Sequence, residues 1–99
     1  MTVFFENGVA NGPNPTENNH TSRGATHVFT STGNFDGAAV TLQIKSPSDP
    51  NGAWTDVVNA ILTSASSKFV EFLPNGYEAR ATISSAGAST DVFAELREA

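Results

Sequence analysis

The chain has 99 residues, no cysteine and a formal net charge of −5. This length corresponds to one domain, and the lack of cysteine excludes disulfide bonds. Lysine and arginine are scattered along the chain rather than clustered, which argues against direct binding of nucleic acid. No apolar run approaches the roughly 20 residues of a membrane-spanning helix, and the N-terminus lacks a signal-peptide pattern. We therefore expect a soluble protein, made in the cytoplasm, with neither nucleic acid nor membrane as partner.

The first 24 residues differ from the rest in composition. After a short β-prone run over residues 2–5, residues 6–24 are dominated by asparagine, glycine and proline, with Val9 as the only sizeable apolar side chain. Such a segment buries too little apolar surface to offset the entropy lost on ordering. We predict an N-terminal strand and extended arm over residues 1–24, followed by a β-sandwich domain over residues 25–99.

The arm is either a strap that contacts a partner or a flexible loop, and we favour the strap. Its prolines favour extended conformations, which lowers the entropy lost on docking. Its backbone and asparagine side chains offer many hydrogen-bonding groups to a partner. The arm residues that we expect to contact the partner are Val9, Asn11, Pro13, Asn14 and Pro15.

From residue 25 onward the chain consists of short segments in which apolar and polar residues alternate. The clearest is residues 40–44, where Val40, Leu42 and Ile44 alternate with polar side chains. Glycine, proline and asparagine turns separate the segments without a βαβ rhythm, so we predict an all-β antiparallel sandwich, Ig-like or jelly-roll-like, of about seven strands. The predicted core consists of Val40, Leu42, Ile44, Trp54, Val70, Phe72, Tyr77, Ala81, Ile83, Val92 and Leu96.

Residues 59–67 allow two interpretations. Apolar residues at helical spacing, from Val57 to Ala65, permit a short helix, whereas β-branched residues and a serine-rich tail count against a long one. We favour a second extended piece near residues 61–63.

The loop over residues 48–54 resembles the Asp-box turn of sialidases and similar β-proteins. We interpret it chiefly as a tight hairpin that closes over a core tryptophan, Trp54. A carbohydrate-binding role is the alternative.

Strand alternation places Phe69 and Phe93 on the side away from the predicted core. Outward aromatic side chains on a small domain indicate a contact surface. The hydrophobic content of 38% fits a domain that gains stability from an assembly. We therefore predict a homo-oligomer in the form of a trimer, with these two residues at or near the contacts between subunits or with the rest of the assembly.

The sequence contains no pattern that indicates catalysis. His20 and His27 are not at the spacing of metal ligands, and there is no phosphate-binding loop or nucleophile motif. We predict that the protein is not an enzyme and that it has no catalytic residues, metal site or cofactor.

Four segments together resemble a class of small virion proteins of tailed bacteriophages, which includes the capsid decoration (cement) proteins. They read F-D-G-A-x-V-T-L-Q, D-x-x-G-x-W, P-N-G-Y-E-A-R-A and S-S-A-G-A-S-T-D-V-F-A, and the resemblance covers residues 34–96. It implies a β-sandwich or jelly-roll-like domain, often trimeric, at three-fold positions on the capsid surface of the virion. There it would clamp neighbouring major capsid subunits against internal pressure after DNA packaging. The alternatives are a phage tail or head-fibre adaptor and a carbohydrate-binding β-sandwich module.

Overall fold

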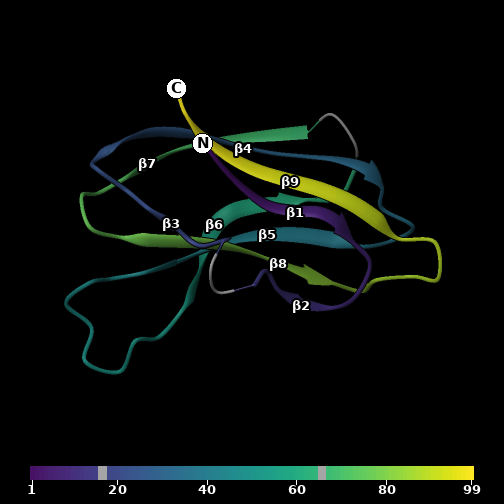
Figure 1. Cartoon of the computed structure of the whole chain (residues 1–99), viewed down its shortest axis with the longest axis horizontal. Coiled ribbons are helices and arrows are strands. Elements are labelled where there is room, and N and C mark those ends of the chain that lie inside the picture. The colour runs from purple at the N-terminus through teal and green to yellow at the C-terminus, as the bar shows by residue number, and fades with distance from the viewer. Residues whose placement is uncertain (16–17, 65–66) are drawn as a thin grey trace.

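The computed structural model describes residues 1–15, 18–64 and 67–99, and for Ser67 it describes only the backbone. Within these ranges the chain forms nine strands in two antiparallel sheets that pack against each other (Figure 1). Sheet A has the order β1-β9-β4-β7; sheet B has the order β2-β8-β5-β6, and β3 also pairs with β8. The strands are β1 (Thr2–Gly8), β2 (Gly12–Pro13), β3 (His20–Thr21), β4 (Ala25–Asn34), β5 (Ala39–Lys45), β6 (Thr55–Leu62), β7 (Ser67–Leu73), β8 (Glu78–Ser84) and β9 (Asp91–Glu98). The predicted antiparallel β-sandwich is thus confirmed.

The segment predicted to be an arm is instead built into both sheets of its own chain. Strand β1 pairs with β9 in sheet A, while β2 and β3 pair with successive parts of β8 in sheet B. These two short strands bring the count above the seven or so predicted. Backbone pairing, which the polar composition does not reveal, orders the segment. Residues 16–17, also part of the predicted arm, lie outside the described residues.

Asn14 continues the pairing with β8 between β2 and β3. Its backbone N–H donates to the Ala81 carbonyl oxygen at 2.9 Å, and its side-chain Oδ1 accepts the Ala81 N–H at 2.8 Å. Its Nδ2 donates to Pro15 O at 2.8 Å and to Asn19 Oδ1 at 3.1 Å. Asn14 is 4% exposed. The prediction that Asn14 contacts a partner is therefore wrong: its polar atoms are used inside the chain.

The core lies between the two sheets and contains most of the residues predicted for it. Those that are buried are Val40, Leu42, Ala81, Ile83, Val92 and Leu96, and Ile44 packs against them. Val70 and Phe72 were also predicted to be buried, but they are 54% and 57% exposed. Trp54 and Tyr77 are only half-buried. The largest side chains at the centre are Phe4 and Phe29, whose ring centroids are 6.3 Å apart.

The error at β7 is a reversal of its two faces. Leu73 is buried and Phe69 packs against the core, opposite Phe29 of β4 in the ladder. The prediction that Phe69 faces outward is therefore wrong. Both faces of β7 carry large apolar residues, so alternation within the strand cannot choose between them; pairing with β4 does, and a one-residue slip exchanges the faces.

Residues 55–62 are extended, so the helical alternative is wrong for this part. A register shift between Thr41 and Gln43 of β5 makes β6 bulge, and Asn59 adopts a positive φ of 65° within it. The bulge turns Val57 and Ala60 inward together, which explains the apparent helical spacing. Residues 65–66 lie outside the described residues.

Replacing Asn14 with alanine should destabilise the fold. Asn14→Ala leaves the buried Ala81 N–H without its acceptor, a loss of about 1–3 kcal/mol in the free energy of unfolding. Asn11→Ala is the matched control, because Asn11 is exposed and its Oδ1 accepts the N–H of Ala86 at the surface. Denaturant unfolding of both variants checks this, and equal losses would contradict it.

Candidate functional site

The outer face of sheet A carries apolar side chains on all four of its strands, exposed on β7 and partly exposed on β1, β4 and β9. On β7, Val70 and Phe72 point away from the core, and Val28 of β4 lies directly opposite Val70 in the ladder. On β9, Phe93 lies between the buried Val92 and Ala94 and so also faces outward. We call the set Val3, Val28, Val70, Phe72 and Phe93 the outer apolar strip. Such a surface on a small protein marks an interaction site.

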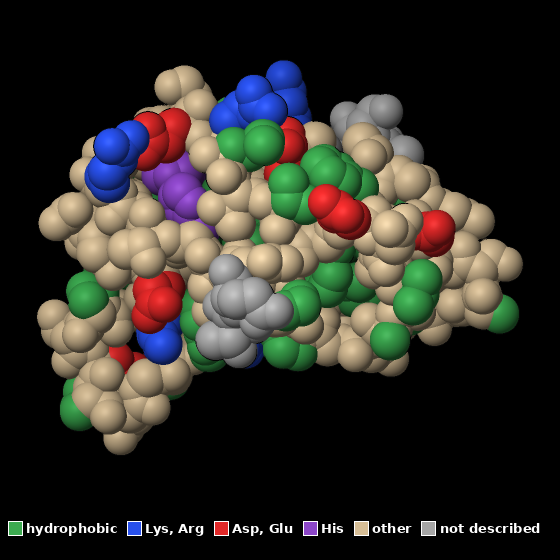
Figure 2. All heavy atoms as spheres, viewed as in Figure 1, with side chains coloured by type: hydrophobic (Ala, Val, Ile, Leu, Met, Phe, Trp, Pro, Cys, Tyr) green, Lys and Arg blue, Asp and Glu red, His purple; other side chains and the backbone are tan. Residues whose placement is uncertain are grey.

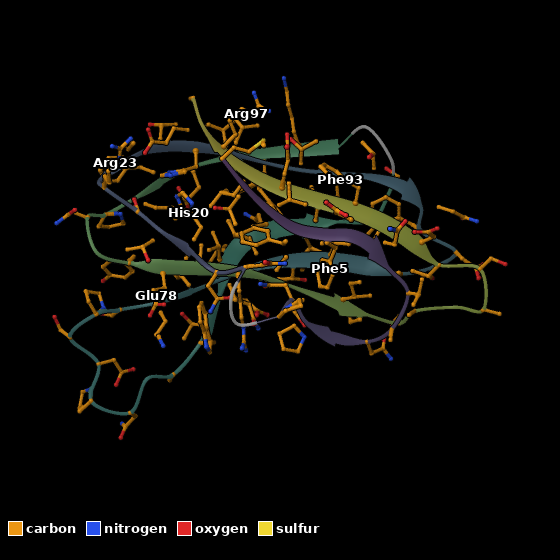
Figure 3. The ribbon with its side chains drawn as sticks, viewed as in Figure 1. Phe5, His20, Arg23, Glu78, Phe93 and Arg97 are labelled. Atoms are coloured by element: carbon orange, nitrogen blue, oxygen red, sulfur yellow. The ribbon has the colours of Figure 1, made fainter. Side chains whose placement is uncertain are left out.

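Charged side chains are interspersed with the outer apolar strip. Arg97 lies on the outer face of β9, with its Nη2 3.8 Å from Glu95 Oε2 and 3.0 Å from Met1 Sδ. Figure 2 shows apolar side chains over β1 and β9 with acidic and basic groups beside them, and Figure 3 shows Phe93 and Arg97 on this part of the sheet. Apolar groups bordered by polar and charged groups are found in protein–protein interfaces.

The residues predicted to contact a partner do not form one surface. Val9 is 59% exposed, Pro13 and Pro15 are exposed, and all three belong to the segment beside β8. Phe93 lies on sheet A, whereas Asn14 and Phe69 face the interior. Sequence reasoning missed Val70 and Phe72 because it assigned them to the core. The signal that could have found them is the pairing of β7 with β4. Phe69 lies opposite Phe29, which is on the inner face, so its neighbour Val70 must point outward.

A series of hydrogen bonds connects two histidines and three strands, β1, β3 and β4. The Nε2 atoms of His20 (β3) and His27 (β4) are 3.0 Å apart, and their rings meet edge to face. His27 Nδ1 lies 2.8 Å from the Ala25 carbonyl oxygen, and His20 Nδ1 lies 2.8 Å from Thr2 Oγ1 of β1. His27 is 1% exposed. These hydrogen bonds therefore connect β1 and β3 to β4, a central strand of sheet A.

The carbonyl of Ala25 fixes the direction of these bonds. A carbonyl can only accept, so His27 Nδ1 carries a hydrogen, and neutral His27 accepts at Nε2 from His20. His20 Nδ1 then accepts from the Thr2 hydroxyl. Burial, followed by the nearby His27, the N-terminal amine and Arg23, lowers the pKa of His20, while Glu98 opposes the shift.

Trp54 lies on the outer side of sheet B rather than in the core. The Arg80 guanidinium carbon is 4.4 Å from its ring centroid, and Lys45 Nζ is 5.1 Å away. Arg80 Nε donates to Gln43 Oε1 at 2.8 Å, and Gln43 Nε2 donates to Asp56 Oδ1 at 2.8 Å. Burial lowers the pKa of Arg80. Cations within the same chain thus contact the Trp54 ring.

The loop that precedes Trp54 is held by one carboxylate. Asp49 Oδ1 accepts the N–H of Asn51 at 2.9 Å, and Oδ2 accepts the N–H of Ala53 at 3.3 Å. Both oxygens thus shape the loop itself, as side chains of aspartate do in Asx turns.

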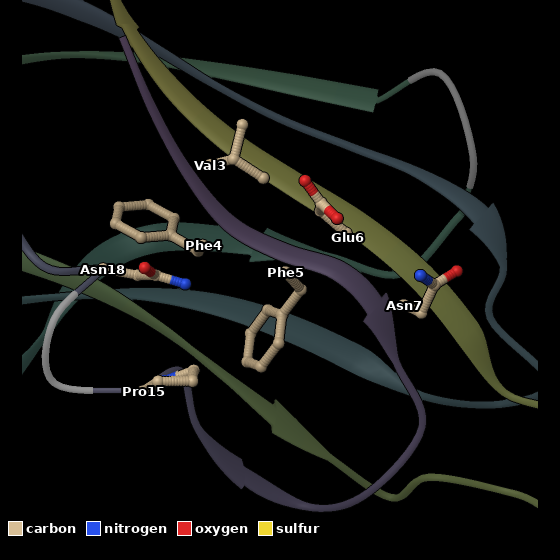
Figure 4. A pocket seen from close by; sticks show the side chains of 7 residues that line it. All are labelled: Val3, Phe4, Phe5, Glu6, Asn7, Pro15 and Asn18. Atoms are coloured by element: carbon tan, nitrogen blue, oxygen red, sulfur yellow. The ribbon is translucent and has the colours of Figure 1, made fainter.

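A hollow of about 420 Å³ lies between β1 and the segment that leads from β2 to β3 (Figure 4). Its lining residues are Val3, Phe4, Phe5, Glu6, Asn7, Pro15 and Asn18. The hollow is open, and residues 16–17, which follow its lining residue Pro15 in the sequence, are not described. We assign no ligand to it.

Within residues 1–15, 18–64 and 67–99, no group of three or more histidine, cysteine or acidic side chains is placed to hold a metal ion. Nor does this part of the chain contain a helix that is long and apolar enough to cross a membrane. Comparison of the chain with protein-family models, with curated proteins and with solved structures found no match.

Acid should weaken the fold through His20. Its pKa in the folded state lies below the unfolded value of 6.5, so the folded chain binds fewer protons. The stability that this contributes is complete above pH 6.5 and is lost as the pH falls toward the lowered pKa. The free energy of unfolding of the native chain should therefore drop more between pH 7.5 and pH 5 than that of His20→Gln, as denaturant titrations measure.

The native protein and His20→Gln carry the same ten acidic residues. The difference in the pH dependence of their unfolding free energies therefore comes from His20. Equal dependence on pH in the two chains would contradict a lowered pKa of His20 in the folded state.

Proposed function

We propose that this protein is a structural component of tailed-bacteriophage particles, a capsid decoration protein that binds the head surface and clamps neighbouring major capsid subunits. The observation that carries the proposal is the outer apolar strip, in which Val70 and Phe72 are more than half exposed on a rigid sheet. A flat apolar surface of this kind fits another protein surface, whereas small-molecule sites are concave.

The rigidity of the sheets also supports a mechanical role. Strand β4 pairs along its length with both β7 and β9 without a register shift. Strands β7, β4 and β9 thus form a continuous ladder behind most of the strip. A load applied to side chains on its outer face would be shared among backbone hydrogen bonds of several strands.

Two of the segments that carry the phage resemblance meet at one end of the sandwich. The turn between β4 and β5 contains Phe35 and Asp36, and the turn between β8 and β9 contains Ser89 and Thr90. Thr90 Oγ1 donates to the Phe35 carbonyl oxygen at 2.8 Å, and the Ser89 N–H donates to Asp36 Oδ2 at 2.8 Å. Gly87 lies so close to Asp36 that a side chain would clash with it. These contacts hold the two turns of this chain together, which supports the firmly connected body that the proposed role requires.

Mass spectrometry of purified virions gives the first test. A decoration protein should be present in a copy number comparable to that of the major capsid protein. A few copies per particle would indicate the tail or head-fibre adaptor instead, and absence from the virion would contradict the proposal.

Variants of the outer apolar strip test the attachment itself. Phe72→Ser combined with Phe93→Ser should weaken binding to undecorated capsids by about tenfold or more, since each ~1.4 kcal/mol of lost contact is a factor of ten. Val58→Ser combined with Ile61→Ser is the control, because these side chains are 78% and 52% exposed on β6 of the other sheet. Occupancy is measured by co-sedimentation with the particles. Equal binding of both variants and the native chain would place the attachment elsewhere.

A further inference from the structure

Strand β7 presents an open edge of sheet A. In the part of the chain that the structure describes, it pairs with β4 and with no other strand. The Phe72 N–H donates to Glu71 Oε1 at 3.2 Å, so it points away from β4. Because backbone groups alternate in direction along an antiparallel strand, Lys68 and Val70 also direct their N–H and C=O groups to the open side.

The other strand edges are guarded in ways that β7 is not. Strand β1 has two register shifts along β9, and β6 has the bulge at Asn59. Strands β2 and β3 are two residues long each, and β2 contains Pro13. Bulges, short strands and proline are the usual means of preventing pairing between molecules. Strand β7 runs for seven residues in unbroken register with β4, and both Val70 and Phe72 are exposed on it.

We propose that a second copy of this chain adds to sheet A by antiparallel pairing of β7 with β7, about a two-fold axis at Val70. The pairing joins the two four-stranded sheets into one continuous sheet. It does not depend on the capsid proposal, because it follows from the open edge.

The outward backbone groups select the register. Hydrogen bonds form between the two copies only in registers that place Lys68, Val70 and Phe72 of one copy opposite residues of the same set in the other copy. An axis at Glu71 would set two carboxylates directly opposite each other, which is unfavourable. An axis at Phe69 would pair Phe72 with a residue that precedes β7. An axis at Val70 avoids both and uses the strand from residue 68 to residue 72.

The side chains at this register are self-complementary, which is the reason for a second copy as the occupant. Val70 meets Val70 of the second copy at the axis. Lys68 lies opposite Phe72 of the second copy on the same face, where an ammonium group and an aromatic ring attract each other. The two lysines are held apart, and no like charges face each other. A two-fold interface uses each such pair twice.

Cysteine crosslinking tests the register, since the native chain has no cysteine. At the axis the Cα atoms of residue 70 would be about 5.5 Å apart, within the range that a disulfide spans. Val70→Cys should therefore form a covalent dimer on mild oxidation. Phe72→Cys is the matched control on the same strand, because its two copies would lie about 13 Å apart, four residues along the ladder. Val58→Cys on β6 is the control for random collision.

Sedimentation velocity tests the association without a crosslink. The native chain should form a dimer at high micromolar concentration, since edge pairing buries a small interface. Val70→Lys should be monomeric, because it sets two ammonium groups together at the axis, and circular dichroism and unfolding should show an unchanged fold because residue 70 is 54% exposed. Val58→Lys should still form the dimer.

Three results would overturn the proposal. They are a native chain that stays monomeric at these concentrations, crosslinking of Phe72→Cys or Val58→Cys as efficient as that of Val70→Cys, and a Val70→Lys variant that dimerises like the native chain. The first would leave β7 free for a strand of a different protein.

Discussion

The edge of β8 must be covered, and the chain covers it with its own N-terminal segment. Asn14 is the residue on which this depends, because its backbone N–H and side-chain oxygen bond both polar groups of Ala81. Buried backbone groups without a partner are costly, so the segment is ordered even though it has little apolar surface to bury. The histidine pair then connects the same segment to β4. Apolar burial of Phe4 anchors β1, whereas hydrogen bonding rather than apolar burial holds residues 9–24 in place.

Alternation in the sequence is sufficient to predict the fold class and the inner faces of β5, β8 and β9. In those strands one face is apolar and the other is polar except at Phe93, and residues such as Leu42, Ile83 and Leu96 are buried as expected. In β7 both faces carry large apolar residues, and the choice between Phe69 and Phe72 depends on pairing with β4. Pairing between distant segments is not encoded in the local pattern, so neither the face of β7 nor the course of residues 6–24 could be predicted from it.

The same limit explains what was missed at the candidate site. His20 and His27 are seven residues apart, which suggests no contact in any regular strand, and they meet because β3 and β4 belong to different sheets. Trp54 was expected in the core because it is large and apolar, but the loop held by Asp49 delivers it to the outer face of sheet B. There Arg80 and Lys45 approach its ring. In each case the contact depends on the pairing of strands and the course of loops, which the local pattern of residues does not reveal.

The edge strands of the two sheets differ in how well they are protected from pairing with another molecule, and this difference determines which surface is open. Three of the four strand edges are closed by a bulge, by proline or by short strands, whereas β7 keeps its backbone groups and two apolar side chains toward solvent. The face and the edge of sheet A meet at Val70 and Phe72. Pairing of two copies at this edge would bring their outer apolar strips side by side and so double the apolar area presented on one rigid surface. Because two linked surfaces bind a repetitive lattice more strongly than one, such pairing would strengthen attachment to a capsid without any new contact.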